Sequence, residues 1–176
     1  MTEEESDFKL FPDVGTGVSD NRDIRVRFMN RCGFVIDLFW LNENKKPTKF
    51  GQLKANQYLD IRTYQNHPWV ARKTEDGSKL KMNNKPVYWP QPVHKNIIRR
   101  DVCQITAKVQ TLKELASRSL LHQNPKIASK DLDNLPRDLQ FEVKNIMNNK
   151  KEYREIVCAP PPSSNLRALR PPPENQ

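Results

Sequence analysis

The chain has 176 residues and a net charge of +9 at pH 7, from 30 Lys and Arg against 21 Asp and Glu. This length allows one ordinary domain, or a small β domain followed by a small helical unit. No apolar run approaches the roughly 18 residues of a membrane-spanning helix, and the N-terminus is acidic, so we expect neither a membrane anchor nor a secretory signal.

The cysteines and histidines are too scattered to indicate a metal site or a disulfide framework. None forms a Cys-x-x-Cys pair or a metal-binding spacing; they are Cys32, Cys103, Cys158, His67, His94 and His122. We therefore expect no metal, no cofactor and a reducing compartment. The positive net charge favours a nucleic-acid partner. However, the basic residues are dispersed along the chain, and no motif that alternates basic and aromatic residues is present. We therefore favour a basic surface that is simply exposed to solvent.

The N-terminal half of the chain carries strand patterns. Residues 1–22 are polar and acidic and are predicted to form a flexible arm. Residues 24–28 and 59–63 alternate apolar and polar side chains, and residues 34–41 are almost wholly apolar, so each segment predicts a strand. The polar residues 42–49, which include a proline, predict a loop.

Turn signals continue this pattern up to residue 108. Residues 69–73 lead into the dipeptide Asp76-Gly77, a hairpin signal, and Leu80 and Met82 continue on a return strand. A short strand is predicted at 87–89 and the last one within 96–108. About seven short strands with closely spaced turns predict a β-sandwich over residues 23–108.

The hydrophobic period becomes helical after residue 108. Thr111 and Glu114 form a capping-box pattern, and a first apolar stripe follows at Leu112, Leu115, Ala116 and Leu120. A second stripe runs through Leu132, Leu135, Leu139, Val143 and Ile146, with Pro136 near its start. We predict a helical domain over 109–157, a proline-rich disordered tail over 158–176, and an α+β fold. Two such helices bury too little to be stable alone, so they pack on the sandwich or on a partner, and the sequence leaves both open.

No catalytic motif is present. The chain lacks a hydrolase elbow, a phosphate loop and a dinucleotide fingerprint, and it has only 5 glycines. The informative cluster is aromatic: Trp40, Phe50, Tyr64, His67 and Trp69 lie within 30 residues. Tryptophans in a sandwich usually belong to its core. The other interpretation is an aromatic-walled pocket in which a histidine and a threonine provide hydrogen bonds.

Four motifs are specific enough to indicate a family: Phe28-Met29-Asn30-Arg31, Trp40-Leu41-Asn42, Tyr64 with His67-x-Trp69-x-x-Arg72, and Thr111-Leu112-Lys113-Glu114. In these motifs the chain resembles the von Hippel–Lindau tumour-suppressor family, over roughly residues 24–150. The resemblance implies a β-sandwich followed by an α domain, in a non-catalytic substrate receptor of a cullin ubiquitin ligase. The expected partners are a 4-hydroxyproline peptide of the hypoxia-inducible factor α subunit, elongin C, elongin B, a cullin and a RING-box protein. The expected location is cytoplasmic and nuclear.

The resemblance also assigns a peptide-binding site. Its residues are Trp40, Phe50, Ile61, Thr63, Tyr64, His67 and Trp69. Aromatic faces can pack on a pyrrolidine ring, and the Thr63 hydroxyl and His67 ring can pair with the hydroxyl of hydroxyproline. Phe50 replaces the family's tyrosine and lacks its hydroxyl, whereas Thr63 replaces a serine and keeps the hydroxyl.

Two docking motifs follow from the same resemblance. Elongin C docking falls on Thr111, Leu112, Ala116 and Leu120, where Ala116 replaces the family's cysteine and leaves a sulfur-sized gap. Cullin docking falls on Leu135, Pro136 and Leu139. This pattern is short, and its position after the elongin motif is what supports the assignment. The alternative function is a basic β-sandwich binding module, for nucleic acid or a scaffold, without a ligase role. Its nucleic-acid affinity would fall steeply with salt.

Overall fold

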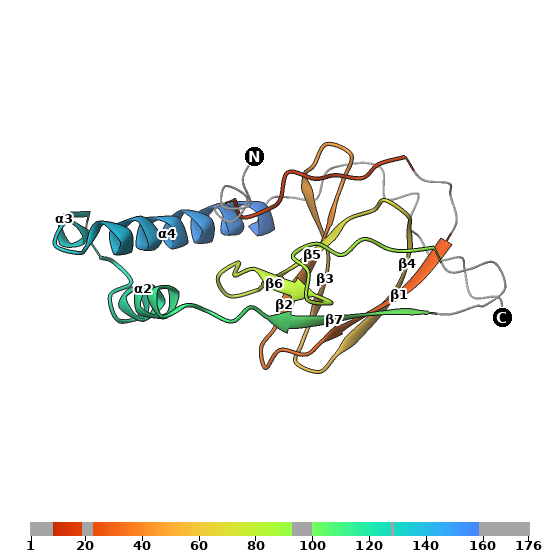
Figure 1. Cartoon of the computed structure of the whole chain (residues 1–176), viewed down its shortest axis with the longest axis horizontal. Helices are drawn as coiled ribbons and strands as arrows, with labels where there is room; N and C mark the ends of the chain where they lie inside the picture. The colour runs from red at the N-terminus through yellow and green to blue at the C-terminus, as the bar shows by residue number, and fades with distance from the viewer. Residues whose placement is uncertain (1–8, 19–22, 93–99, 128, 159–176) are drawn as a thin grey trace.

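The computed structural model describes residues 9–18, 23–92, 100–127 and 129–158. A β-sandwich lies at one end of the molecule and the helices extend from it at the other (Figure 1). This arrangement confirms the predicted α+β class, with the strands preceding the helices. Within the described ranges no helix is both long and apolar enough to cross a bilayer.

The sandwich consists of two sheets. The first has the order β4-β1-β7-β6, and the second has the order β3-β2-β5. The strands are β1 (Asp23–Asn30), β2 (Ile36–Leu41), β3 (Pro47–Leu53), β4 (Tyr58–Tyr64), β5 (Trp69–Lys73), β6 (Leu80–Met82) and β7 (Asp101–Ala107). β1 is antiparallel to β4 and parallel to β7. Its alternation places Val26 and Phe28 in the core and leaves Arg25 exposed, as the sequence pattern predicts.

Two segments differ from the sequence predictions. Residues 47–49, expected in a loop, begin strand β3, an edge strand in which only Leu53 is buried. Its pattern was missed because an edge strand needs few apolar residues and tolerates the initial Pro47. Residues 87–89 do not form a strand; instead Tyr88 bridges Trp69 through two backbone hydrogen bonds of 2.9 Å. Part of the last predicted strand, residues 96–99, lies outside the described residues.

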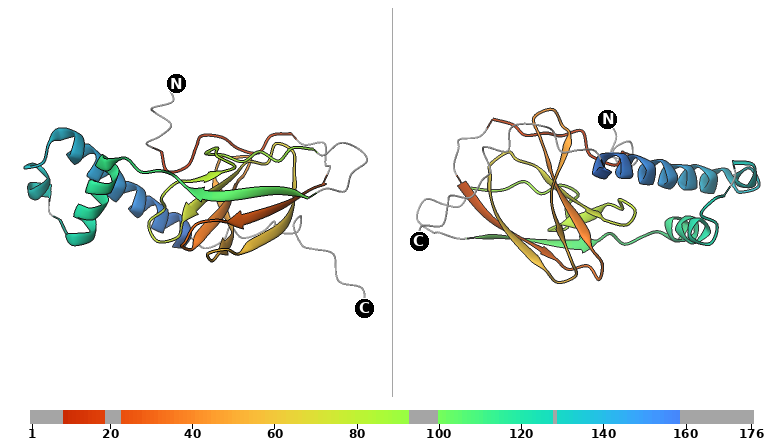
Figure 2. Two further views of the ribbon diagram at one scale, coloured as in Figure 1. Left: turned by 60° about the horizontal axis from the view of Figure 1, so that its bottom comes forward. Right: turned by 180° about the vertical axis from the view of Figure 1, so that it is seen from behind.

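The helices begin where their capping signals predict. α2 (Leu112–Gln123) starts with a complete capping box, in which the Glu114 backbone N–H donates to Thr111 Oγ1 at 3.1 Å and the Thr111 N–H donates to Glu114 Oε2 at 2.8 Å. α3 (Ser129–Leu132) is short, and α4 (Arg137–Cys158) begins directly after Pro136. Figure 2 shows α2 beside the first half of α4, while the end of α4 reaches the sandwich.

A second apolar cluster covers the outer face of the three-stranded sheet. It joins the N-terminal segment and the end of α4 to the strands, through Leu10, Phe39, Leu41, Val70 and Tyr153. Leu10 is 2% exposed, and its carbonyl accepts a 3.0 Å hydrogen bond from Arg72 Nε. Residues 9–18 therefore pack on the sandwich, which differs from the flexible arm expected there. Residues 1–8, 19–22 and 159–176, which include most of that arm and of the proline-rich tail, lie outside the described residues.

Tyr153 anchors the end of α4 through a buried polar network. Its phenol donates to Oδ2 of Asp37, which is fully buried on β2. Asp37 Oδ1 also accepts from Lys49 Nζ and Gln52 Nε2, each at 3.0 Å. Burial and the Asp37 carboxylate raise the pKa of the Tyr153 phenol, which keeps it protonated as a donor.

We predict that Gly77→Ala loosens this anchor. Gly77 has φ +74°, and a Cβ there would lie 2.6 Å from Cγ of Tyr153. Strain in the left-handed region and overpacking together should lower the free energy of unfolding by about 2–4 kcal/mol. Urea unfolding measures this change. Gly33→Ala is the control, because a Cβ at Gly33 has no neighbour within 4 Å. Equal small effects of both substitutions would contradict the close packing of Tyr153 on Gly77.

Candidate functional site

The predicted peptide-binding residues gather where the two sheets meet. Trp40 on β2 and Trp69 on β5 are directly opposite each other in the strand register, so their side chains share the inner face of the sheet. The Trp69 indole Nε1–H donates across to Thr63 Oγ1 on β4 at 3.0 Å. This hydrogen bond links the two sheets and fixes the orientation of the Trp69 ring.

A β-bulge directs Phe50 into this group. Leu38 pairs with Gly51 and Phe39 pairs with Lys49, which leaves Phe50 as the extra residue of β3. Bulges redirect a side chain relative to the regular alternation. The ring of Phe50 meets Trp69 edge-on, with centroids 5.2 Å apart and planes at 81°, and Phe50 remains 37% exposed. Phe50 is therefore the accessible edge of this group, and Trp69 its buried part.

Thr63 is buried, at 1% exposure, yet its hydroxyl keeps hydrogen-bonding capacity. The oxygen accepts from Trp69, and among the described residues no acceptor takes the Thr63 hydroxyl proton. A hydroxyl both donates one hydrogen bond and accepts others. Thr63 can thus hold Trp69 and also donate to a ligand.

His67 forms the other half of the group. Its ring stacks on Trp40 with centroids 5.5 Å apart and planes at 13°, and it contacts the Tyr64 ring at 5.2 Å. Burial lowers the pKa of His67 below its ordinary 6.5, and the Glu43 carboxylate opposes the shift. The neutral imidazole offers one donor and one acceptor. Neither nitrogen is hydrogen-bonded to another described residue.

Six of the seven predicted residues thus belong to one aromatic cluster with two halves. Trp40, Tyr64 and His67 form one half, and Phe50, Thr63 and Trp69 form the other. The register pair Trp40–Trp69 joins the halves. Ile61 is the exception, because it packs within the sandwich core. The cluster combines apolar ring faces with the hydroxyls of Thr63 and Tyr64 and one imidazole, which suits an apolar ring that carries a hydroxyl. No group of three or more His, Cys, Asp or Glu that could hold a metal is found in the described part of the chain.

Sequence reasoning missed Thr16, whose Oγ1 accepts a 2.7 Å hydrogen bond from the Trp40 indole. Thr16 lies in the segment predicted to be a flexible arm, and its sequence carries no periodic signal that would place it on the sandwich. Its contact with Trp40 is visible only in the folded chain.

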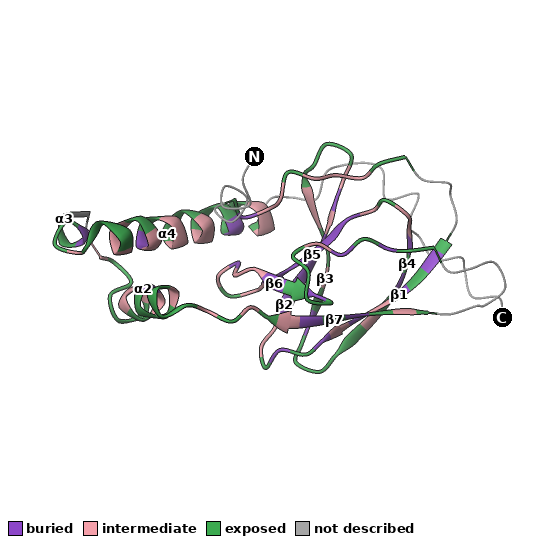
Figure 3. Cartoon of the chain, in the orientation of Figure 1, coloured by how far each residue is buried: buried purple, intermediate pink, exposed green. Residues whose placement is uncertain are grey.

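The apolar stripe of α2 faces solvent. Leu112 is 86% and Leu115 48% exposed, Ala116 is also exposed, and Leu120 is half-buried. Ser117, not a leucine, is the buried residue of the helix. In Figure 3, α2 shows mainly the colours of exposed and intermediate residues. The sequence left open whether this stripe packs on the sandwich or on a partner. In the structure it does not pack on the sandwich. In the second motif Leu135 and Leu139 are half-buried and Pro136 is exposed.

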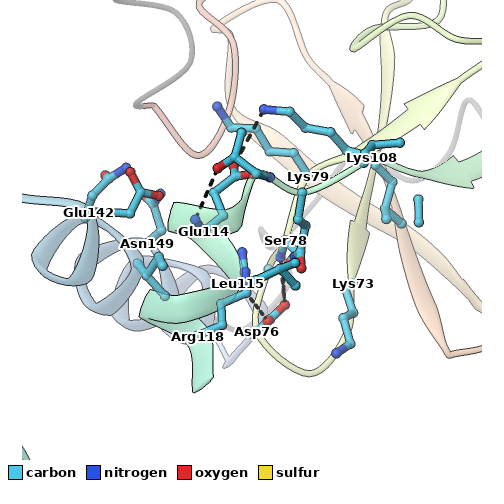
Figure 4. Close-up of a pocket in the computed structure, with 18 of the residues that line it drawn as sticks. Lys73, Asp76, Ser78, Lys79, Lys108, Glu114, Leu115, Arg118, Glu142 and Asn149 are labelled. Atoms are coloured by element: carbon cyan, nitrogen blue, oxygen red, sulfur yellow. Dashed lines mark hydrogen bonds and ion pairs between the residues drawn. The ribbon is translucent and has the colours of Figure 1, made fainter. Parts of the chain in front are cut away.

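A cavity of about 980 Å³ lies elsewhere, between the β5–β6 turn, α2 and α4 (Figure 4). The predicted hairpin is not formed as a pair of strands, because after this turn β6 pairs with β7 in the other sheet. Arg118 of α2 crosses the cavity and pairs with Asp76 of that turn, with Nη1 and Oδ2 2.6 Å apart. Lys108 and Glu114 form a looser pair at 3.8 Å. The cavity therefore separates the helices from the sandwich, and these ion pairs bridge it.

Residues 17–96 match the family model of the VHL beta domain. The matched segment contains β1 to β6 and all seven predicted peptide-binding residues, whereas β7 and the helices lie beyond it. The match supports a VHL-like protein and places the aromatic cluster in the part of the chain that carries the similarity.

The lowered pKa of His67 predicts a pH dependence of stability. Above pH 6.5 His67 is neutral in both states; as the pH falls below 6.5, the unfolded chain takes up a proton that the folded chain resists. His67 therefore makes the free energy of unfolding decrease with falling pH in this window, and His67→Gln should remove that contribution. Urea unfolding of both proteins at several pH values between about 5 and 7.5 tests it. Parallel pH profiles of the two proteins would contradict the shift.

Proposed function

We propose, from the match of residues 17–96 to the VHL beta domain, that this chain is the substrate receptor of a cullin ubiquitin ligase. The sandwich would bind a 4-hydroxyproline peptide of the hypoxia-inducible factor α subunit. The helical residues 109–157 would dock elongin C and, through it, elongin B, a cullin and a RING-box protein. The receptor itself transfers no ubiquitin, and we propose a cytoplasmic and nuclear location.

The aromatic cluster is the observation that carries the proposal. Trp40 and Phe50 offer accessible ring faces of the kind that pack on a pyrrolidine ring. Thr63 retains a hydroxyl proton, and His67 retains a donor and an acceptor, so each of them can hydrogen-bond to the hydroxyl of a ligand. In an ordinary protein core, these polar groups would be hydrogen-bonded to other residues of the chain.

The exposure of α2 supports the second half of the proposal. An aliphatic side chain as exposed as Leu112 adds no folding stability here, and together with Leu115 and Ala116 it forms an apolar strip on one helix face. Such a face suits insertion into the groove of a partner. For the cullin motif, Leu135 and Pro136 lie just before α4 and Leu139 lies in its first turn; Pro136 is exposed and both leucines are half-buried.

The test of peptide recognition is a titration with two peptides that differ only in one proline hydroxyl. We expect a preference for hydroxyproline of about 10³ or more, because plain proline leaves two buried groups unpaired at roughly 1–3 kcal/mol each. Isothermal titration calorimetry measures both affinities.

Variants locate the origin of this preference. His67→Ala should remove most of it, whereas Phe50→Tyr should strengthen both peptides similarly, because the added hydroxyl lies at the exposed edge of the cluster. Thr63→Ser, which keeps the hydroxyl, should retain the preference. Equal affinity of both peptides for the unmodified chain would refute the proposal. Affinity for nucleic acid that falls steeply with salt would favour the alternative binding module.

The test of the helical half is Leu112→Asp. A charge on this exposed position should leave the fold intact but abolish binding to the elongin B–C pair, since burying an unpaired charge in the interface costs several kcal/mol. Co-purification and peptide titration are measured together. Val102→Asp is the matched control, because Val102 is also an exposed apolar residue, 42% accessible, but lies on β7. Parallel loss of elongin and peptide binding in Leu112→Asp would show that Leu112 stabilises the fold.

A further inference from the structure

We propose that residues 14–18 form a strap that belongs to the recognition site, with Thr16 as the positioning residue that sets the orientation of Trp40 against His67. This inference rests on the proposed peptide recognition and extends it to a segment that precedes β1. Thr16 lies just before the residues that match the family model, which begin at residue 17.

Thr16 connects the Trp40 side chain to the backbone. The Trp40 Nε1–H donates to Thr16 Oγ1 at 2.7 Å, and the Thr16 hydroxyl donates to the Leu41 carbonyl at 2.8 Å. The hydroxyl thus acts as acceptor and donor at once, which fixes its own rotamer and the plane of the indole. Trp40 is only half-buried, so packing alone restrains its ring less than it would in the core.

The strap is held by the two loops that flank the site. The Thr16 N–H donates to the Asn42 carbonyl at 3.2 Å, two residues after Trp40. The Gly17 N–H donates to the Asn66 carbonyl at 3.0 Å, and Asn66 Nδ2 donates back to the Val18 carbonyl at 2.8 Å, next to His67. One short segment therefore ties the loop after Trp40 to the loop that carries His67. In Figures 1 and 2 this N-terminal segment runs along the edge of the sandwich past the β2–β3 loop.

Close approach of the strap requires Gly15. A Cβ at this position would lie 2.5 Å from the Asn42 carbonyl oxygen, which is backbone and has little freedom to move. A larger residue would therefore lift the strap from the β2–β3 loop. The sequence Gly15-Thr16-Gly17 thus combines a small residue for approach with a hydroxyl for hydrogen bonding.

The strap determines what Trp40 can offer a ligand. The indole has a single N–H donor, and Thr16 occupies it. Trp40 therefore contributes an apolar ring face, stacked on His67 at 13°, and no hydrogen bond. This favours a ligand ring without an acceptor at that position, and it leaves His67 and Thr63 as the groups that recognise a ligand hydroxyl.

The experiment measures Trp40 directly in the full chain. The three tryptophans give three indole N–H signals in a nitrogen–proton NMR spectrum, which Trp→Phe variants assign. Thr16→Val keeps the shape but removes the acceptor, so the Trp40 indole signal should shift and exchange with solvent at least about ten-fold faster, as expected for the loss of one hydrogen bond. The Trp69 signal, held by Thr63, should not change. Thr16→Ser should restore the Trp40 signal, and Val109→Thr, at an 87% exposed position outside the strap and the aromatic cluster, is the neutral control.

Titration of the hydroxyproline peptide completes the test. Thr16→Val should weaken its binding about ten-fold, and Thr16→Ser should restore it. An unchanged Trp40 signal or unchanged peptide affinity in Thr16→Val would overturn the inference. If the unmodified chain binds no hydroxyproline peptide, the proposed function fails; a Trp40 signal that still depends on Thr16 would then support the strap as the device that orients Trp40.

Discussion

Burial of both faces of β2 is the constraint on which the rest of the molecule depends. Ile36 and Leu38 point into the space between the sheets, while Phe39 and Leu41 point to the opposite side. A strand that is apolar on both faces must be covered twice. The first cover is the other sheet. The second is assembled from the N-terminal segment and the end of α4, the two parts of the described chain furthest apart in sequence.

This double burial also explains the polar network on the outer face. Asp37 lies between apolar neighbours on β2 and is fully buried, so it requires partners for its carboxylate. Lys49 and Gln52 come from the adjacent strand, and Tyr153 comes from α4. Removing one partner from such a network is costly because the carboxylate would stay buried. The helix is therefore placed on the sheet by a specific set of donors in addition to apolar contact.

The same strand connects the packing to the site. Trp40 lies between the core position Leu38 and the loop that the strap covers, so its ring is held by the sheet on one side and by Thr16 on the other. The accessible residues of the site therefore lie on strands and short loops that are held in place by the sandwich core and by the strap. At the other end of the molecule, α2 is tied to the β5–β6 turn by Arg118 and Asp76, yet Leu112 and Leu115 of this helix remain exposed. The proposed adaptor role would use these two separate surfaces, the aromatic cluster on the sandwich for recognition and the exposed face of α2 for docking.

Much of the fold could be predicted from local patterns. The alternation in β1 and β4, the Asp76-Gly77 turn, and the capping box at Thr111 and Glu114 depend on neighbours in sequence, and each is found where it was expected. β3 could not be predicted, since an edge strand exposed to solvent carries little apolar signal. The aromatic residues of the candidate site were named from motif resemblance. Their stacking and the Trp69–Thr63 bond required the strand register and the bulge at Phe50.

The sequence by itself determined the α+β order, the type of most elements and the residue types available for recognition, because propensity, periodicity and capping act within a few residues of each other. Only the tertiary structure decided that Leu10 is core, that Thr16 holds Trp40, that Asp37 and Tyr153 meet, and that Leu112 stays uncovered. These facts depend on contacts between residues 24 to 116 positions apart, or on the absence of such contacts. No local pattern encodes them, since they arise only when the sheets and the helix are assembled.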